Sequence, residues 1–197
     1  ATLDGSLTVI EYLRDSFRHL YEINEKLEEI YAKMGEVTDE DELDKLVRKS
    51  SRMQDELNEK NFYDLDSQIK KVANGLGINE VGYDKKISLL SGGQRAKLML
   101  SKLLLQDLDI MLLDEPTNFL DIEHIEWLTK YLNSFKKTFI VISHDIKFLN
   151  NVAQYIVNIE NGVIRKFTGN YDKFLAQRDM IAKQYEEDYE RQQAEIK

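Results

Sequence analysis

The chain has 197 residues, of which 42% are hydrophobic and 32% charged, enough for one domain with a core or a smaller core with helical extensions. It has no cysteine, which excludes disulfides and thiolate metal sites, and no run of 18 apolar residues that would span a bilayer. The net charge of −9 argues against a surface that binds nucleic acid all over, although not against a local contact. With no signal-peptide pattern at its start, the sequence predicts a cytoplasmic protein without a membrane partner.

The first stretch, up to about Gly77, is predicted to form helices that pack on one another. Seam positions recur at alternating spacings of four and three, as on a helix that contacts a partner helix. In a first helix they are Leu13, Phe17, Leu20, Asn24, Leu27, Tyr31 and Met34, and in a second Leu43, Leu46, Ser50, Met53 and Leu57. Residues 38–42 offer N-cap oxygens and an acidic first turn, so we expect an antiparallel hairpin that turns near Gly35.

A third helix is expected after this hairpin. Its apolar positions share one face, and glycines mark its end. The apolar residues are Leu65, Ile69, Val72 and Leu76, and the glycines are Gly75 and Gly77.

An α/β part is predicted between residues 86 and 170. The apolar runs 110–113 and 139–142 are typical of strands buried on both faces of a parallel sheet. A helix is expected between them over 122–132, which makes a right-handed crossover unit. Its inner face is formed by Ile125, Leu128 and Leu132.

The C-terminal part is predicted to contain a β-hairpin and a long helix. Residues 155–160 and 163–167 flank Asn161-Gly162, which favours a type I′ turn. The charged helix that follows, over 171–197, carries only a thin apolar stripe and is expected to need a partner. The stripe consists of Phe174, Ile181, Tyr185, Tyr189 and Ile196.

A glycine pair follows Ser91 in the segment Leu90-Ser91-Gly92-Gly93-Gln94, directly before a helix predicted over Arg95–Leu105. Two adjacent glycines let backbone amides approach a ligand, and the Ser91 hydroxyl adds a further hydrogen-bonding group. Because free N–H groups and the positive end of the helix dipole lie at a helix start, the segment predicts an anion site. Taken alone, such a segment is more often a turn with an N-cap serine.

Two carboxylates, Asp114 and Glu115, follow the apolar run 110–113, and the carboxyl end of such a strand is where α/β sheets bind ligands. Asp114 is suited to hold Mg²⁺, directly or through a water. Glu115 is expected to point the other way and to polarise an attacking water as a general base. The alternative, a strand that simply ends in a polar turn, is disfavoured by the segment 116–121 that comes next.

His144, in Ser143-His144-Asp145, follows the second predicted strand in the same manner. An imidazole at this place is able to hydrogen-bond a γ-phosphate oxygen and to sense its departure. His19 and His124 lie on predicted helix faces and are expected to be ordinary satisfied polar residues.

In this order and spacing, the three motifs resemble the ATP-binding-cassette ATPase family. Residues 90–94 resemble the family's signature loop, 110–115 its Walker B strand and catalytic Glu, 118–121 its D-loop, and His144 its switch histidine. The resemblance implies part of an α/β P-loop ATPase core with ATP and Mg²⁺ as cofactors, catalytic roles for Glu115 and His144, and Mg²⁺ binding by Asp114. The residues that it implies contact the nucleotide are Leu90, Ser91, Gly92, Gly93, Gln94, Asn118 and Asp121.

Flanking segments resemble one subgroup, the first nucleotide-binding domain of ABC-F proteins. These segments are residues 7–10, the acidic hairpin, 122–128, 167–171, and the tail at 184–185 and 192–196. ABC-F proteins lack transmembrane domains and act on ribosomes as translation factors or antibiotic-protection factors. The resemblance thus implies a second ABC domain as a partner and, through the linker that begins in the tail, the ribosome with its rRNA and tRNA. Phe119 departs from the family, which commonly has His there, and is expected to alter only the packing of the D-loop.

This resemblance divides the chain into three segments. Residues 1–85 are expected to form a helical, arm-like subdomain, 86–170 the C-terminal part of the nucleotide-binding core, and 171–197 the start of the interdomain linker. The family's phosphate-binding loop, Gly-x-x-x-x-Gly-Lys-Ser/Thr, does not occur, and no glycine is followed by lysine. Because that loop supplies most of the β- and γ-phosphate binding, we expect that the chain is a piece of a longer protein and is inactive alone.

Two other interpretations of the sequence stay open. The ATPase subunit of a transporter is disfavoured, because the region where such a subunit contacts membrane helices is a charged hairpin here. In a second, non-enzymatic interpretation, the helical parts 7–77 and 171–197 form an interaction module, and the chain self-associates through exposed sheet and core.

Overall fold

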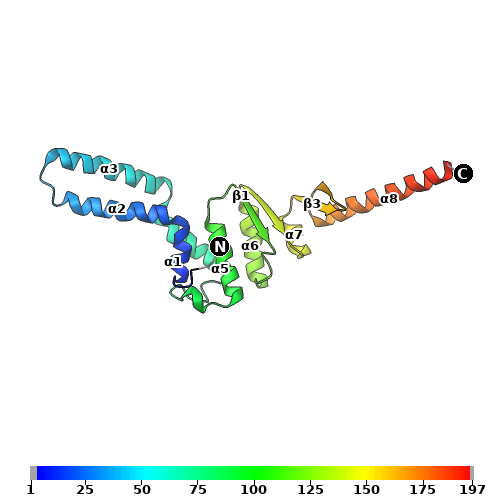
Figure 1. Ribbon diagram of the computed structural model, residues 1–197, viewed down its shortest axis with the longest axis horizontal. Coiled ribbons are helices and arrows are strands. Elements are labelled where there is room, and N and C mark those ends of the chain that lie inside the picture. Colours follow the sequence, from blue (N-terminus) through cyan, green and yellow to red (C-terminus); the bar gives the residue numbers. More distant parts are fainter. Residues whose placement is uncertain (1–3, 196–197) are drawn as a thin grey trace. The chain divides into compact units, whose positions relative to one another are not determined.

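The structure, a computed structural model, describes residues 4–195, and the chain divides into two compact units, Ala1–Asp107 and Leu108–Lys197 (Figure 1). The first unit is helical, and the second combines a parallel strand pair, helices and an antiparallel hairpin. The predicted α/β fold with parallel strands and a C-terminal β-hairpin is therefore confirmed. The functional division into residues 1–85, 86–170 and 171–197 remains a prediction.

The elements follow the chain in simple order. The first unit contains α1 (Val9–Arg14), the 3₁₀ helix η1 (Asp15–Phe17), α2 (Arg18–Met34), α3 (Glu40–Glu59), η2 (Phe62–Asp64), α4 (Leu65–Gly75), η3 (Ile87–Leu89) and α5 (Gly92–Leu105). The second contains β1 (Ile110–Asp114), α6 (Ile122–Ser134), β2 (Thr138–Ile142), α7 (Ile146–Val152), β3 (Tyr155–Glu160), β4 (Val163–Thr168) and α8 (Tyr171–Glu195).

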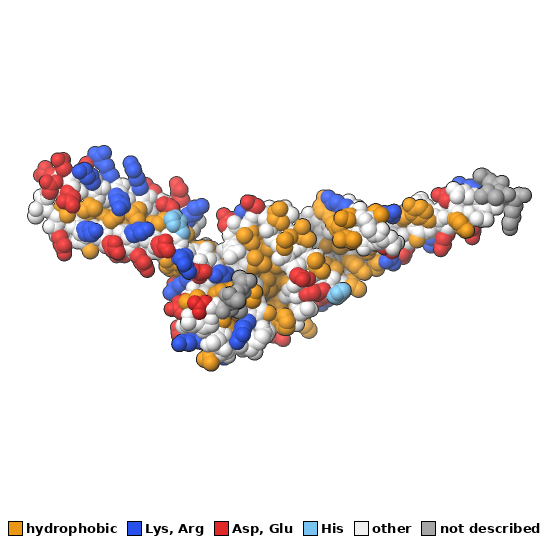
Figure 2. Space-filling model, viewed as in Figure 1, with side chains coloured by type: hydrophobic (Ala, Val, Ile, Leu, Met, Phe, Trp, Pro, Cys, Tyr) orange, Lys and Arg blue, Asp and Glu red, His pale blue; other side chains and the backbone are white. Residues whose placement is uncertain are grey.

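The helices α2 and α3 form the predicted hairpin and run side by side in Figure 1. Gly35 is the C-cap of α2, and Asp39 caps α3 by accepting a hydrogen bond from the Glu42 N–H over 2.8 Å. Both acidic and basic side chains project from the hairpin on the face seen in Figure 2. The small core between the helices consists of Ile23, Leu27 and Leu57, with Leu20, Met53 and Phe62 packed against it.

The seam of the first helix differs from the prediction, because η1 interrupts the helix that was expected to run over residues 13–34. A 3₁₀ turn takes three residues instead of 3.6. The residues that follow it are therefore rotated about the helix axis, and a different set of α2 residues faces α3. Ile23 and Ile30 are buried there, whereas the predicted seam residues Asn24 and Tyr31 are not.

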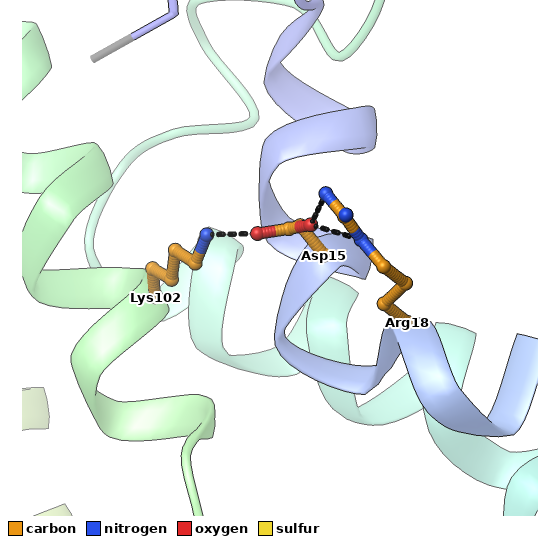
Figure 3. A network of polar contacts seen from close by, with 3 residues as sticks. All are labelled: Asp15, Arg18 and Lys102. Atoms are coloured by element: carbon orange, nitrogen blue, oxygen red, sulfur yellow. Dashed lines mark hydrogen bonds and ion pairs between the residues drawn. The ribbon is translucent and has the colours of Figure 1, made fainter. Parts of the chain in front are cut away.

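The interruption is held by an ionic network centred on Asp15 (Figure 3). Lys102 of α5 donates a hydrogen bond to Asp15 Oδ2 over 2.6 Å, and Arg18 donates to Asp15 Oδ1 through Nε over 2.8 Å. The Lys102 ammonium also lies 4.2 Å from the centroid of the Tyr12 ring, a cation–π contact. The hydrogen bond from Lys102 holds the pKa of Asp15 below its usual range. These contacts tie α5 to the start of α2.

A second carboxylate, Asp66 in the first turn of α4, binds Arg14, the residue that precedes Asp15. Arg14 donates to it twice, from Nε to Oδ1 over 3.0 Å and from a terminal nitrogen to Oδ2 over 2.6 Å. The Tyr21 hydroxyl donates to Asp66 Oδ1 over 2.9 Å. Burial and then this hydrogen bond raise the pKa of Tyr21 to about 12, so its phenol remains a donor at neutral pH. Asp66 therefore links α1, α2 and α4.

The third predicted helix is confirmed as α4. Leu65, Ile69 and Val72 are buried along one of its faces, and Leu76 is buried just beyond its end. Gly77 has a φ of +73°, the left-handed conformation that favours glycine where a helix stops.

In the second unit, β1 and β2 pair in parallel, and Asp114 lies opposite Ile142 at their carboxyl ends. Burial alternates along β1: Met111 is fully buried, whereas Leu112 is 67% exposed. The prediction that both faces of these strands are buried is therefore wrong, because apolar neighbours cover one side of the strand pair only. The exposed face carries Ile110, Leu112, Ile140 and Ile142.

The predicted β-hairpin and C-terminal helix are confirmed. β3 and β4 pair antiparallel, and Asn161 and Gly162 have φ values of 50° and 76°, as a type I′ turn requires. Phe167 of β4 and Phe174 of α8 pack edge to face with ring centroids 5.0 Å apart, which anchors the start of α8. Of the predicted stripe, Ile196 lies outside the described residues. Within residues 4–195, no helix combines the length and apolar character needed to cross a bilayer.

Candidate functional site

The chain turns sharply at Glu115, directly after β1. The Glu115 N–H extends the parallel ladder by donating to the Ile142 carbonyl over 2.8 Å. Glu115 has a φ of +45°, in the left-handed region that side chains with a Cβ rarely adopt. Such a conformation costs about 1–3 kcal/mol and occurs mostly at functional sites. As expected, the adjacent carboxylates have different surroundings: Asp114 is exposed, whereas the Glu115 side chain is 22% exposed.

The Glu115 carboxylate contacts His144, which directly follows Ser143 at the end of β2. The His144 backbone N–H donates to Glu115 Oε2 over 3.3 Å, and His144 Nε2 lies 3.4 Å from Glu115 Oε1. Oε1 is buried and accepts no hydrogen bond from the described residues. The imidazole is 98% exposed and so is open to a ligand. A buried carboxylate oxygen that accepts no hydrogen bond, next to an exposed imidazole, is suited to hold a reacting water.

The loop that carries His144 is held by its neighbours in sequence. The Ser143 hydroxyl accepts a hydrogen bond from the Asp145 N–H over 3.1 Å. Asp145 in turn caps α7 by accepting from the Phe148 N–H over 2.9 Å, and Phe148 is buried. This role of Asp145 is not among the sequence-based predictions, although an N-cap residue before an apolar helical run is a recognisable signal.

The segment after Glu115 forms a compact turn that leads into α6. The Asn118 N–H donates to the Glu115 carbonyl over 3.3 Å, and the Leu120 N–H donates to the Thr117 carbonyl over 3.1 Å. Thr117 is buried, whereas the predicted nucleotide contacts Asn118 and Asp121 are exposed. The turn therefore presents both side chains to solvent, and the Asn118 backbone contacts that of Glu115.

Ser91 belongs to the first unit, where it caps α5. Its hydroxyl accepts from the Gln94 N–H over 3.2 Å, and the Gln94 side chain accepts from the Ser91 N–H over 3.1 Å, which forms a capping box. The helix begins at Gly92, so the prediction that it starts at Arg95 is wrong, and both Gly92 and Gly93 lie in its first turn. The capping box offsets the low helix propensity of the two glycines.

The start of α5 is open on one side and anchored on the other. Ser91 and Gly92 are exposed, and a Cβ atom added at Gly92 would meet no atom within 4 Å. Leu90 is only 4% exposed and anchors the loop in the core. Arg95 donates to the Ser88 carbonyl over 3.1 Å and so fixes the preceding turn. The backbone amides at this helix start are therefore accessible to an anion.

The first unit offers donors for an anion, and the second offers a carboxylate for a cation. The hydroxyl and first-turn amides of α5 suit a phosphate, and the exposed carboxylate of Asp114 suits a hard cation. Among residues 4–195, no three His, Cys, Asp or Glu side chains converge on a possible metal site. Because Mg²⁺ is typically held by one or two carboxylates, waters and substrate phosphates, a single carboxylate is an adequate protein ligand.

The structure brings Asp114, Glu115 and His144 together at one edge of the parallel strand pair, as the sequence predicts. Asn118 follows in the next turn. The segment 90–94 belongs to the other unit, so its place opposite these residues remains a prediction. The two histidines that were expected to be ordinary satisfied polar residues, His19 and His124, differ in burial.

His124 is buried within α6 at 9% exposure. His19 is exposed on α2, and its Nε2 lies 3.3 Å from Glu56 Oε1 of α3. His124 Nε2 lies 4.0 Å from Asp121 Oδ2, directly before α6, and His19 belongs to the first unit, so neither histidine is assigned to the site.

Comparisons with known proteins point to one family. A family model described as "ABC transporter" matches residues 10–118, and a second with the same description matches residues 157–197. A solved structure of an ATP-binding subunit of an ABC transporter covers 90% of this chain and 59% of its own length, with a TM-score of 0.57 and 17% identity. This likeness supports the fold.

Curated relatives share more of the sequence. "Uncharacterized ABC transporter ATP-binding protein YfmM" of Bacillus subtilis is 43% identical over 98% of this chain, which is 37% of the relative. "ABC transporter F family member 5" of Arabidopsis thaliana is 36% identical over 97% of the chain and 28% of the relative. "Energy-dependent translational throttle protein EttA" of Escherichia coli (strain K12) is 34% identical over 90% of the chain and 31% of the relative. The chain thus spans about a third of the length of these relatives.

Proposed function

This chain belongs to the ATP-binding-cassette family, and on that premise we propose that the full-length protein is an Mg²⁺-dependent ATPase of the ABC-F group that acts on the ribosome in the cytoplasm. The observation that carries the proposal is the contact of Glu115 with His144 at the carboxyl ends of two neighbouring parallel strands. Ligands of open α/β sheets bind at this edge.

Glu115 is the proposed general base. The His144 N–H fixes one of its carboxylate oxygens, which leaves the buried Oε1 to accept a proton from the water that attacks the γ-phosphate. The left-handed backbone of Glu115 keeps the carboxylate in place before the reaction, so little reorganisation is needed. The exposed imidazole of His144 is proposed to hydrogen-bond a γ-phosphate oxygen and so to report whether the phosphate is present.

Asp114 is the proposed ligand of Mg²⁺, directly or through a water. When bound, the ion neutralises charge on the β- and γ-phosphates. Asp114 stays exposed at the strand end, apart from the Glu115 carboxylate, so one acid is able to bind the cation while the other accepts a proton.

The start of α5 is the proposed contact for a nucleotide held mainly by a second ABC domain. The Ser91 hydroxyl, the backbone amides of Gly92 and Gly93 and the side-chain NH₂ group of Gln94 supply donors for phosphate oxygens, with Leu90 as their anchor. Asn118 and Asp121 are proposed to face the same partner domain. Closure of the two domains over ATP then completes each site.

We expect that residues 1–197 alone bind ATP very weakly and do not hydrolyse it, because the sequence has no glycine-lysine phosphate loop. Isothermal titration calorimetry with Mg-ATP, paired with a phosphate-release assay, tests this expectation. A dissociation constant in the micromolar range would contradict it.

The ribosome as target is supported by the relative named as a translational throttle and by the charged helix α8, which is proposed to begin the interdomain linker. Such a protein serves as a translation factor or as an antibiotic-protection factor. Sedimentation of the full-length protein with ribosomes, with and without a non-hydrolysable ATP analogue, tests the proposal. ATP-dependent sedimentation with ribosomes is the expected result, and sedimentation only with membranes would favour the ATPase subunit of a transporter.

A further inference from the structure

A short link, Ser143-His144-Asp145, joins the end of β2 to the start of α7, and Glu115 binds the chain on both sides of Ser143. The Glu115 N–H donates to the Ile142 carbonyl over 2.8 Å, and Glu115 Oε2 accepts from the His144 N–H over 3.3 Å. A hydrogen bond to a carboxylate is among the stronger kinds, and it weakens steeply when the donor points away from the acceptor. The direction of the His144 N–H therefore decides how firmly the Glu115 carboxylate is held.

The side chain of His144 does not hold this link in place. Its imidazole is 98% exposed, so packing around the ring gives the backbone no support. Support comes instead from Asp145, the next residue along the chain. The Asp145 N–H donates to the Ser143 hydroxyl over 3.1 Å, which folds the link into a compact turn.

Asp145 is in turn tied to the core of the second unit through α7. Its Oδ1 accepts from the Phe148 N–H and its carbonyl accepts from the Leu149 N–H, each over 2.9 Å, as at a helix N-cap. Phe148 and Leu149 are only 1% and 9% exposed. From α6, the Asn133 side-chain amide donates to the Asn151 carbonyl over 3.1 Å. Asp145 thus joins an exposed link to a helix that is fixed by its own packing.

We propose that Asp145 is a positioning residue for ATP hydrolysis: by capping α7 it aims the His144 N–H at the Glu115 carboxylate. The inference rests on the proposed function, in which Glu115 accepts a proton from the attacking water. Asp145 acts through the side-chain oxygen that accepts the Phe148 N–H, and its charge is not required. An amide or hydroxyl oxygen at this position is able to accept the same hydrogen bond.

Turnover kinetics of the full-length protein test the proposal. Asp145→Ala should lower kcat by roughly 10- to 100-fold, because a displacement of about 1 Å near the reacting atoms costs up to about 10²-fold. KM for Mg-ATP should change by less than about twofold, since the lost interaction acts on the chemical step and not on substrate binding. Asp145→Asn and Asp145→Ser each keep a capping oxygen and should restore most of the lost turnover.

Asp39→Ala is the matched control, because it removes the same kind of cap from another helix. Asp39 accepts from the Glu42 N–H at the start of α3 over 2.8 Å, close to the 2.9 Å of the side-chain bond at Asp145. This variant should keep the kcat of the wild type. Thermal unfolding followed by circular dichroism should show that every variant is folded at the assay temperature.

A double-mutant cycle separates positioning from a general weakening of the fold. In a Glu115→Gln background no base is left to be positioned, so adding Asp145→Ala should lower the residual turnover by less than about twofold. A loss of folded protein would instead lower turnover by the same factor in both backgrounds. An equal loss in the two backgrounds would therefore overturn the inference.

Three further results would also overturn it. They are an Asp145→Ala protein with the kcat of the wild type, a loss in Asp145→Asn as large as in Asp145→Ala, and a rise in KM without a fall in kcat. The second would assign the role to the charge of Asp145, and the third would assign this residue to nucleotide binding. Unchanged turnover in the Glu115→Gln protein itself would instead contradict the proposed base, so the two failures are distinguishable.

Discussion

Glu115 combines a costly backbone conformation with a carboxylate oxygen that has no hydrogen bond among the described residues. Each feature alone reduces the stability of the folded chain. Both are understandable if the residue must present a fixed, unshared lone pair to a reacting water. At the residue scale, the stability lost at Glu115 supports a catalytic role for this residue more directly than does its position in a motif.

The exposed N-cap of α5 yields a prediction for the full-length protein. Ser91→Arg should reduce ATP hydrolysis by roughly 10²-fold or more, because bulk and charge at the helix start prevent a second domain from closing over the nucleotide. ATP binding to the separated domain should be nearly unaffected. Steady-state hydrolysis and equilibrium binding of a fluorescent ATP analogue measure the two effects.

Ser91→Thr is the matched control, because it keeps a capping hydroxyl. It should retain most of the activity. Full turnover in the Ser91→Arg protein would contradict a role of this helix start in the closed state.

At this scale the sequence predicts which residues belong to the site but not their geometry. Two acids and a histidine after apolar runs are sufficient to place Asp114, Glu115 and His144 at one sheet edge. The positive φ of Glu115 and the hydrogen bond from the His144 backbone were not predictable, because both depend on how two strands end beside each other. The start of α5 at Gly92 was not predicted, because the low helix propensity of glycine favours a start after the glycine pair. The capping box of Ser91 and Gln94 overrides that preference.

At the scale of elements, η1 is where the charged hairpin meets the rest of the first unit. Asp15 and Asp66 anchor it from two sides, one toward α5 and one toward α4. Lys102 is only 17% exposed, so its ammonium needs the Asp15 carboxylate as a partner.

Asp15→Asn should therefore destabilise the first unit by about 1–2 kcal/mol, the usual cost of leaving a partly buried charged donor without its full partner. Urea denaturation followed by circular dichroism measures the change. The exposed pair of Asp44 and Arg48 offers a control, since Asp44→Asn should cost less than about 1 kcal/mol. Equal effects of the two substitutions would show that Asp15 is no anchor.

The same contact predicts a pH dependence. Because the pKa of Asp15 is lowered in the folded chain, its stabilisation is fully present above the ordinary value of 3.8 and is lost as the pH falls through the lowered folded value. The difference in stability between wild type and Asp15→Asn should accordingly shrink in acid.

Helix and strand positions were largely predictable, and the errors have identifiable causes. The spacing of Leu13, Phe17 and Leu20 continues through η1, so the apolar pattern gives no sign of the break; polar contacts of Asp15 decide it. The apolar runs of β1 and β2 correctly predict strands. They do not reveal that this chain covers only one face of the pair, because burial depends on neighbours and not on the run itself.

At the scale of the whole molecule, the exposed apolar face of β1 and β2 predicts self-association of the isolated chain. Ile110, Leu112, Ile140 and Ile142 are each at least 55% exposed on this face. Multi-angle light scattering should show a mass above that of a monomer at high concentration, since contiguous exposed apolar surface drives association. Leu112→Lys/Ile140→Lys should shift the chain toward the monomer.

The control variant Val47→Lys changes an exposed apolar residue of the first unit and should leave the mass unchanged. If the double variant associates as strongly as the wild type, the helical surfaces and not the strand face are responsible. That outcome would favour the helical interaction module as the source of self-association.

The most direct measurement compares ATP turnover by the full-length protein with that of its Glu115→Gln variant. Glutamine keeps an oxygen that accepts the His144 N–H but cannot take a proton, so hydrolysis should fall by roughly 10²–10⁴-fold while ATP binding stays intact. Glu123→Gln, on the exposed side of α6, should turn over ATP like the wild type. Unchanged turnover in the Glu115→Gln protein would show that another group is the base.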